Sequence, residues 1–156
     1  MEIEYDALRE EVLRFLDQHK VLFLATCANG RVTARAMSCV HVGLEIYFQT
    51  SRDSVKFAQI SKNPNVALCA ANIAIEGVAT ISEHPLDPAS EQFIMLYQEH
   101  HYDSFNAYSR LESNVVIRVD PTLVAFWKYD DEGKPYREFL YVGEGRAVRE
   151  PVESCL

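Results

Sequence analysis

The sequence predicts a mostly β fold, an antiparallel barrel with helices at its periphery. About eight short apolar segments follow one another with turn residues between them, which is typical of antiparallel folds. Helical periodicity is limited to the N-terminus, one short segment near the middle and an insert at about residues 86–111. Closing a sheet removes its exposed edges, which favours a barrel. The alternative is an open antiparallel sheet with helices on one face.

The first half of the chain alternates between helical and strand patterns. The expected elements are a helix over residues 4–19, strands over 21–27, 31–42 and 44–50, and a helix over 53–62. Asn29-Gly30 forms a hairpin turn because these residues accept positive φ angles. Gly43 makes a second tight turn, and Asn63-Pro64 ends the second helix.

The second half contains the helical insert and the last strands. The expected elements are strands over 66–71 and 73–83, helices from 87 and over 103–111, and strands over 115–119, 123–129 and 137–142. Asp87 caps the first of these helices with Pro88 at its first position, and Asp103 caps the next. Residues 130–134 form a loop. The polar tail over residues 144–156 is expected to end loosely.

Composition narrows the function classes. At 156 residues with 48% apolar content, residues 1–156 form a single domain. A net charge of −8 argues against a nucleic-acid partner, and no apolar run is long enough to span a membrane. The N-terminus does not resemble a signal peptide, so a cytoplasmic location is expected. The four cysteines form no C-x-x-C pair and are expected to be reduced thiols.

Residues 35–56 contain the best candidate for a functional site. Arg35 lies in a strand, and Lys56 lies in the first turn of the helix that follows the next strand. A helix start offers free N–H donors and the positive end of the helix dipole. An arginine adds a planar fork and a lysine adds a point charge, so the two can hold a phosphate together. The alternative is that Arg35 lies on a solvated strand face, because Val32, Ala34 and Ala36 are apolar.

Three motifs resemble those of the pyridoxamine 5'-phosphate oxidase-like family of FMN-binding split barrels. Arg35-Ala36-Met37-Ser38 is similar to the family's Arg-Met-Val-Leu strand. Phe48-Gln49-Thr50, Ser54-Val55-Lys56 and Asn63-Pro64 are similar to its Tyr-Thr, Ser-Arg-Lys and Asn-Pro sequence. Trp127 and Arg137 have the separation of a Trp and an Arg that reach the flavin from the partner subunit. The resemblance covers roughly the whole chain in element order and implies a split-barrel homodimer.

The resemblance also implies a role for each matching residue. Arg35 and Lys56 bind the FMN phosphate, with Ser54 and Val55 beside it, and the backbone of residues 36–38 lines the flavin ring. Ala36, Met37 and Ser38 supply that backbone. Gln49 and Thr50 contact the ring or the ribityl chain. Trp127 and Arg137 complete the site across the homodimer interface.

The chain departs from the family's oxidases at four positions. Val40, Val55, Gly133 and Pro135 stand where those enzymes have charged or imidazole side chains. Val55 falls in the Ser-Arg-Lys motif, so the resemblance implies that the cofactor phosphate site is only partly kept. The other three changes imply that the vitamin-phosphate substrate site is absent, so a true pyridoxamine-phosphate oxidase is not expected. No metal site is expected, because adjacent histidines such as His100-His101 point about 100° apart on a helix.

The function that follows is an FMN-dependent oxidoreductase that passes hydride or electrons between a nicotinamide donor and an unknown small molecule. No nucleophile–base set stands out, so the catalytic residues stay unknown, and a flavin would carry the redox chemistry. NAD(P)H would bind transiently, because no GxGxxG fingerprint is present. The alternatives are a non-enzymatic flavin-binding stress or sensor protein, and a split barrel that binds deazaflavin or haem. Haem would need His41, His100 or His101 as an axial ligand.

Overall fold

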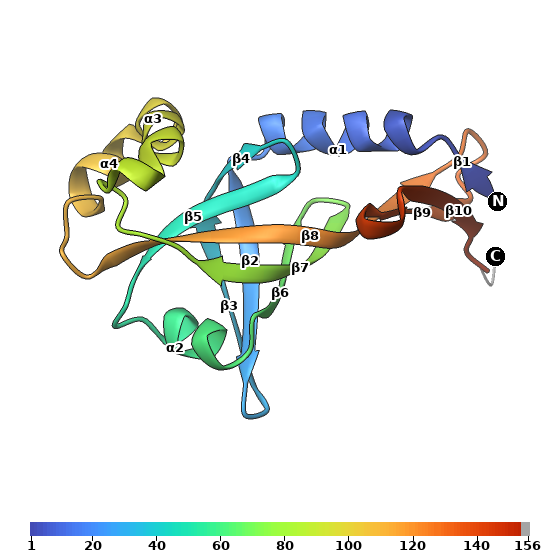
Figure 1. The fold of residues 1–156 in the computed structure, drawn as a ribbon. Helices are drawn as coiled ribbons and strands as arrows, with labels where there is room; N and C mark the ends of the chain where they lie inside the picture. The colour runs from blue at the N-terminus through green and yellow to red at the C-terminus, as the bar shows by residue number, and fades with distance from the viewer. Residues whose placement is uncertain (154–156) are drawn as a thin grey trace.

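The computed structural model describes residues 1–153, which form one ten-stranded antiparallel sheet with helices around it (Figure 1). The strands are β1 (Glu2–Ile3), β2 (Val21–Ala28), β3 (Arg31–Ser38), β4 (Val40–Val42), β5 (Glu45–Ser51), β6 (Asn65–Ala70), β7 (Ile73–Ile81), β8 (Asn114–Tyr129), β9 (Pro135–Tyr141) and β10 (Arg146–Pro151). The α-helices are α1 (Tyr5–Gln18), α2 (Val55–Lys62), α3 (Glu91–His100) and α4 (Tyr102–Tyr108). The predicted mostly β split-barrel fold is confirmed.

The sheet has the strand order β1-β10-β9-β8-β7-β6-β2-β3 and is not closed by hydrogen bonds. β8 organises it, because one edge of this 16-residue strand pairs with β7 along its length. The other edge pairs with β5 in its first half and with β9 in its second half. The sheet therefore does not close completely, and β3, at one end of the order, keeps a free edge within the described residues.

β8 replaces two predicted strands, because it runs straight through Pro121. Gly77 of β7 pairs with Pro121 and Glu76 pairs with Leu123, so Thr122 is the extra residue of a bulge. Before the bulge the core-facing residues of β8 are at odd positions such as Val119, and after it they are at even positions such as Val124. The bulge therefore turns Trp127 outward.

Of three local predictions, two need correction and one, the cap at Asp87, is confirmed. The strand predicted over 31–42 breaks at Cys39, whose N–H donates to the carbonyl of Lys20 at 2.9 Å. Asp87 does cap its helical turn, accepting from Ala89 N at 2.9 Å. Asp103 does not cap α4, because His101 is at the N-cap position and makes no side-chain cap bond.

The polar tail from Glu144 contains a strand that the sequence pattern did not reveal. β10 pairs with β9 and with β1, and its Ala147 and Val148 are buried. The sequence did not indicate this strand, because its Arg and Glu residues leave little alternation of apolar and polar positions. The rest of the predicted loose tail, residues 154–156 with Cys155, lies outside the described residues.

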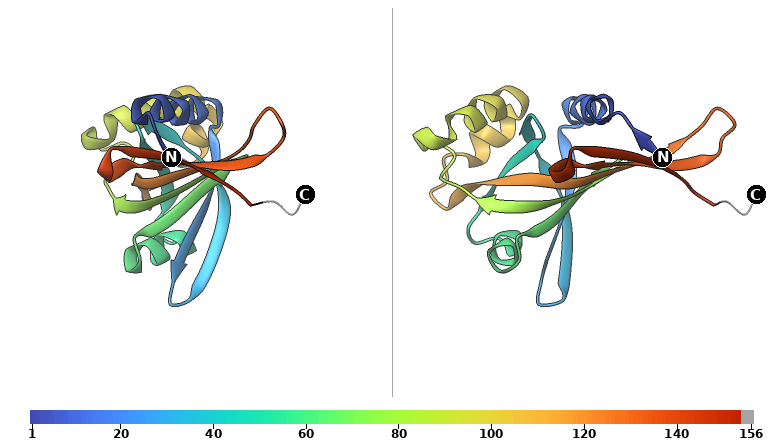
Figure 2. Two further views of the ribbon diagram at one scale, coloured as in Figure 1. Left: turned by 90° about the vertical axis from the view of Figure 1, so that its right-hand side faces the viewer. Right: turned by 45° about the vertical axis from the view of Figure 1, so that its right-hand side comes forward.

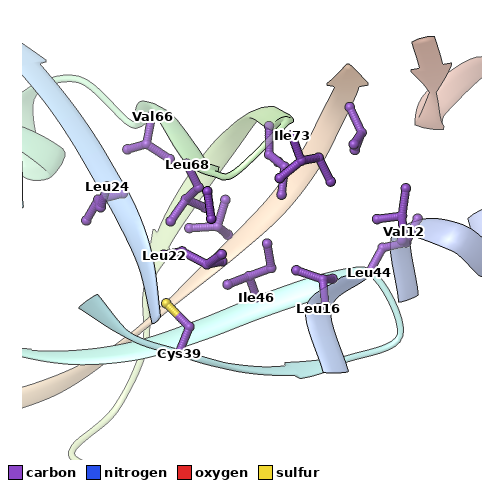
Figure 3. Packing of buried hydrophobic residues seen from close by; sticks show 14 of the residues in the cluster. Val12, Leu16, Leu22, Leu24, Cys39, Leu44, Ile46, Val66, Leu68 and Ile73 are labelled. Carbon is purple, nitrogen blue, oxygen red and sulfur yellow. The ribbon is translucent and has the colours of Figure 1, made fainter. Parts of the chain in front are cut away.

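The core lies between α1 and the inner face of the sheet, where Leu16, Leu22, Ile46 and Leu68 meet in the view of Figure 3. A second cluster lies under α3 and α4 and contains Phe93, Tyr97 and Phe105. Within residues 1–153, no helix is both long and apolar enough to cross a bilayer.

An ion-pair network joins α1 to strands β8, β9 and β10. Lys128 of β8 lies 2.5 Å from Glu11 of α1 and 2.8 Å from Glu138 of β9. Arg149 of β10 lies 3.5 Å from the same Glu138, whose side chain is almost fully buried. The network fixes α1 to the arm formed by β8, β9 and β10, which projects from the body in Figure 2.

Candidate functional site

Arg35 lies on the side of β3 that faces the core, not on the solvated face. Its Cα partner in β2 is Leu24, which is fully buried. The apolar neighbours Ala34 and Ala36 are the exposed ones. The alternative drawn from the strand pattern is therefore wrong, because the outer face of β3 is the apolar one.

Hydroxyl and amide groups hold the Arg35 guanidinium in place. Its Nη1 donates to Thr26 Oγ1 at 2.8 Å, and its Nη2 donates to Thr33 Oγ1. Both threonines donate in turn to Oε1 of Gln59 from α2, at 2.5 and 2.6 Å. Gln59 Nε2 donates to the carbonyl of Arg31 at 3.1 Å. Because these partners are neutral, they orient the Arg35 guanidinium without neutralising its charge.

Lys56 lies close to Arg35 in the first turn of α2. Burial lowers the pKa of Lys56, and the charge of Arg35 lowers it further. Burial also lowers the pKa of Arg35. No carboxylate within residues 1–153 forms an ion pair with either cation. Two half-buried cations without a counter-charge favour an anionic ligand.

The start of α2 adds backbone donors beside these cations. Ser54 is the N-cap, and its Oγ accepts from Phe57 N at 3.2 Å and lies 2.9 Å from Thr50 Oγ1. Helix geometry leaves the N–H groups of Val55 and Lys56 without intrahelical acceptors. Val55 is exposed and contributes only its backbone there. Thr50, Ser54, Val55 and Lys56 therefore lie together at the start of α2, and Lys56 lies close to Arg35.

Gln49 of β5 supplies a buried hydrogen-bond donor beside the helical insert. The side chain is 7% exposed, and its Oε1 accepts from Ser109 Oγ of the segment after α4 at 2.9 Å. Its Nε2 has no partner with hydrogen-bond geometry within residues 1–153, although the Gln49 side chain is close enough to the Tyr97 hydroxyl to lower its pKa. An unmet buried donor costs about 1–3 kcal/mol, which an acceptor on a ligand would recover.

The helical insert brings polar groups to the end of β3. Tyr97 is buried, which raises the pKa of its hydroxyl although Ser104, Ser38 and Gln49 oppose this shift. His101 Nε2 donates to the carbonyl of Cys39 at 2.8 Å. Burial lowers the pKa of His101, outweighing that hydrogen bond, so its imidazole is neutral at physiological pH.

The backbone of Ala36, Met37 and Ser38 lies on an edge strand. β3 pairs only with β2, so its other edge has no strand partner within the described chain. That edge offers N–H and C=O groups to a planar ligand. Along β3 this edge runs from Arg35, which lies close to Lys56, to Ser38, which lies with Gln49 around the Tyr97 hydroxyl.

Trp127 and Arg137 do not join this cluster within one chain. They are direct partners across β8 and β9, on the arm that extends away from α2 (Figure 1). Trp127 is 40% exposed, and Arg137 lies 3.8 Å from Glu150 rather than beside Asp130 or Glu132. Both side chains line a shallow groove, together with Ala74, Ala125 and Phe126.

Sequence reasoning missed the residues that support the site. Thr26 and Thr33 flank the β2–β3 hairpin, and Gln59 lies in the middle of α2. Their only sequence signal is a pair of threonines placed symmetrically about Asn29-Gly30. Ser109 gave no signal, because its partner Gln49 is 60 positions away.

Comparison with known sequences gives one family match and one curated relative. A family model described as pyridoxamine 5'-phosphate oxidase matches residues 8–128. General stress protein 26 of Bacillus subtilis (strain 168) is 44% identical over 59 residues, which is 38% of this chain and 42% of that protein. The match therefore spans less than half of the length of this relative.

Solved structures share the fold at low identity. PhzG from Burkholderia lata 383, in complex with tetrahydrophenazine-1-carboxylic acid, has a TM-score of 0.66 at 17% identity, covering 97% of this chain and 96% of PhzG. A pyridoxamine 5'-phosphate oxidase-related, FMN-binding protein from Nostoc punctiforme has a TM-score of 0.63 at 17% identity, covering 96% and 95%. The haem storage protein HutZ from Vibrio cholerae has a TM-score of 0.61 at 21% identity, covering 72% and 88%.

Proposed function

The chain belongs to the pyridoxamine 5'-phosphate oxidase family, and from that premise we propose that it is an FMN-binding flavoprotein. The observation that carries the proposal is the pair of unneutralised cations, Arg35 and Lys56, beside the free N–H groups at the start of α2. A phosphate there would accept from the arginine fork, the ammonium group and the helix start. Ser54 and Thr50 line the same point.

The residues beyond the phosphate site fit a flavin ring. The free edge of β3 at Ala36, Met37 and Ser38 offers backbone donors, and Gln49 Nε2 is a buried donor without an acceptor. When bound, the isoalloxazine ring supplies the hydride and electron transfer. Gln49 would donate to a ring oxygen, and Thr50 would hold the end of the ribityl chain nearest Ser54.

We propose that the protein acts as a homodimer with the cofactor at the interface. The outer face of the sheet is apolar and exposed: Phe23 is 53% exposed and Val32 is 69% exposed. Phe23 pairs with Ala36 on one side and with Cys69 on the other, and Cys69 pairs with Ala74. A face of this kind supports association with a second copy. In such a dimer Trp127 and Arg137 of one chain would reach the flavin of the other.

The proposed activity is transfer of hydride or electrons from a transiently bound nicotinamide donor to a small molecule. The positions at which the family's oxidases bind the vitamin phosphate carry no suitable side chain: Val40 is buried, and Gly133 and Pro135 offer no charge. We therefore propose that its substrate is not a vitamin phosphate. A non-enzymatic flavin-binding stress or sensor protein is the alternative.

Haem and deazaflavin are the alternative cofactors. The hydrogen bonds of the histidines argue against haem, because His41 has one ring nitrogen 2.8 Å from the Gly43 carbonyl and the other 2.6 Å from Asp17. His101 commits Nε2 to Cys39. Only His100 keeps both nitrogens free of short hydrogen bonds within residues 1–153, since its nearest carboxylate, Glu99, is 3.9 Å away.

The test is titration of the purified protein with FMN, followed by flavin fluorescence and light scattering. We expect one FMN per chain, a dimer, and two flavin absorption bands. Steady oxidation of NADPH with a dye acceptor would favour the enzyme over the binding protein. A protein that takes up haem but no flavin would refute the proposal.

A cytoplasmic location is also proposed. The three cysteines within residues 1–153, Cys27, Cys39 and Cys69, are free thiols. Free thiols are usual in a reducing compartment.

A further inference from the structure

Gln59 of α2 lies at the centre of the hydrogen bonds that hold the Arg35 guanidinium, and its side chain is only 5% exposed. Its Oε1 accepts from the hydroxyls of Thr26 and Thr33, and its Nε2 donates to the Arg31 carbonyl at 3.1 Å. The opposite orientation would place the amide oxygen against that carbonyl oxygen, where neither atom carries a hydrogen. The Arg31 carbonyl therefore selects the orientation in which the amide oxygen faces both threonines.

The orientation of the Gln59 amide determines what the two threonine hydroxyls can offer to Arg35. A hydroxyl has one hydrogen, and each threonine donates that hydrogen to Gln59 Oε1. The oxygens of Thr26 and Thr33 therefore remain as acceptors, and they accept from Nη1 and Nη2 of Arg35. A guanidinium carries donors and no acceptor, so this polarity is the one that suits it.

The threonines occupy the terminal edge of the Arg35 guanidinium, which is formed by Nη1 and Nη2. Within residues 1–153 the hydrogen bonds of this group start from Nη1 and Nη2, and Nη1 also lies 3.4 Å from the Leu24 carbonyl oxygen. A second hydrogen on Nη2 and the hydrogen on Nε remain. These two N–H groups form the lateral edge of the guanidinium, which can bind two oxygens of one phosphate.

We infer that Gln59 is a positioning residue for phosphate binding, although it does not itself touch the phosphate. The inference rests on the proposed function, because it requires the cofactor phosphate at Arg35. By keeping the hydroxyls of Thr26 and Thr33 as acceptors, Gln59 holds the terminal edge of the guanidinium and leaves the lateral edge to the ligand. Without the amide, the hydroxyls are free to turn their hydrogens toward Arg35, and the guanidinium loses its fixed orientation.

Gln59 also has an ordinary structural role, because its bond to the Arg31 carbonyl joins α2 to the β2–β3 hairpin. Loss of that role would lower the melting temperature and displace the whole start of α2, including Lys56. A positioning role acts through Arg35 alone. The two roles therefore differ in how a change at Gln59 combines with a change at Arg35 or at Lys56.

The experiment is a double-mutant cycle on the FMN dissociation constant, measured by flavin fluorescence, with riboflavin as the ligand that lacks the phosphate. We expect Gln59→Met, which keeps the side-chain length and removes both polar atoms, to weaken FMN binding about fivefold and to leave riboflavin binding unchanged. In the Arg35→Ala background the same change should have no further effect, whereas in the Lys56→Ala background its effect should remain. Gln18→Met, at the exposed end of α1, is the matched control.

A matched pair at Thr33 gives a second measurement if thermal melting shows that Gln59→Met is unfolded. Thr33 is only partly buried, so changes there disturb the core less than changes at Gln59. Thr33→Val removes the hydroxyl that accepts from Arg35 Nη2 and should weaken FMN binding, but only while Arg35 is present. Thr33→Ser keeps the hydroxyl and should bind FMN like the wild type.

Three other results would overturn the inference and leave the proposed function standing. They are an FMN affinity that Gln59→Met leaves unchanged or lowers equally for riboflavin, a full effect of Gln59→Met in the Arg35→Ala background, and equal FMN affinities for Thr33→Val and Thr33→Ser. Each of them would assign Gln59 a structural role only. A wild type that binds no FMN would refute the proposed function and the inference together.

Discussion

The Ser109 hydroxyl donates a 2.9 Å hydrogen bond to Gln49 Oε1 and thereby fixes the orientation of the Gln49 amide. Ser109 is fully buried, so this bond is protected from water. With the oxygen engaged, the amide presents its Nε2 as a free donor. The helical insert thus determines that the Gln49 amide offers its Nε2 donor, and not its oxygen, to the proposed flavin-ring site.

Replacement of Ser109 by alanine tests this relationship. We expect Ser109→Ala to weaken FMN binding about three- to tenfold, because loss of one hydrogen bond worth about 1 kcal/mol frees the amide to turn its oxygen toward the ligand. Fluorescence titration measures the effect. Ser61→Ala, which removes an exposed hydroxyl from α2, is the control. An unchanged FMN affinity in Ser109→Ala would show that the helical insert does not influence the proposed flavin-ring site.

Arg35→Ala and Lys56→Ala should each weaken FMN binding by at least about tenfold, since each charged contact to a phosphate is worth about 1.5–3 kcal/mol. Riboflavin, which lacks the phosphate, should bind the variants and the wild type alike. Calorimetry with both ligands makes the comparison. Equal losses for FMN and riboflavin would show that the two cations do not contact the phosphate.

Trp127 is the only tryptophan of the chain, so its emission reports directly on its surroundings. In the proposed dimer it lies near the partner's flavin, and its emission should fall when FMN binds. A variant that breaks the interface, such as Phe23→Asp, should remain monomeric and keep the emission. Full emission in a dimeric, FMN-loaded wild type would reject this placement of Trp127.

Gly77→Ala should destabilise the fold by roughly 1–3 kcal/mol. A Cβ at position 77 would lie 2.7 Å from Val119 Cγ1 and 2.9 Å from the Asp120 carbonyl oxygen, opposite the β8 bulge. Urea denaturation measures the loss. Gly143→Ala is the matched control, because a Cβ there meets no atom within 4 Å. Equal midpoints for the two variants would contradict the expected clash.

The Lys128 network predicts a pH-dependent contribution to stability. Burial alone would lower the pKa of Lys128, but the hydrogen bonds and charges of Glu11 and Glu138 outweigh it and raise the pKa above 10.5. Because the folded pKa is the higher one, the stabilisation is complete below pH 10.5 and is lost as the pH rises through the folded pKa. Lys128→Met should therefore be destabilising by roughly 3 kcal/mol at neutral pH, since Glu138 stays buried.

Urea denaturation at neutral pH and above pH 10.5 measures this difference. The gap between wild type and variant should shrink at the higher pH, while titrations common to both proteins cancel. Lys134→Met, which removes an exposed pair with Glu132, should have little effect at either pH. A gap that stays constant with pH would show that the charge of Lys128 is not what stabilises the arm.

The sequence predicted the elements that have strong local signals. Apolar periodicity located α1, and Asn29-Gly30 located the first hairpin, where both residues have positive φ angles. It did not predict β10, because an edge strand rich in Arg and Glu shows little alternation. It also split β8 at Pro121, although a bulge allows a proline to remain within the strand.

The site was predictable only where charge and turn chemistry act locally. Arg35, Ser54 and Lys56 follow from a strand, a cap and a helix start. The supports of Arg35 do not, because Thr26 and Gln59 meet across 33 positions of sequence. The side of β3 on which Arg35 lies depends on what covers the sheet, and period-two alternation does not specify that.

The single extra residue at Thr122 has an evolutionary consequence. Deleting it would shift every later β8 side chain to the opposite face, burying the indole of Trp127 and expelling Phe126 into solvent. Insertions and deletions should therefore accumulate among homologues in the loop over residues 130–134, which can absorb them, while the length of the segment from 114 to 129 is inherited unchanged.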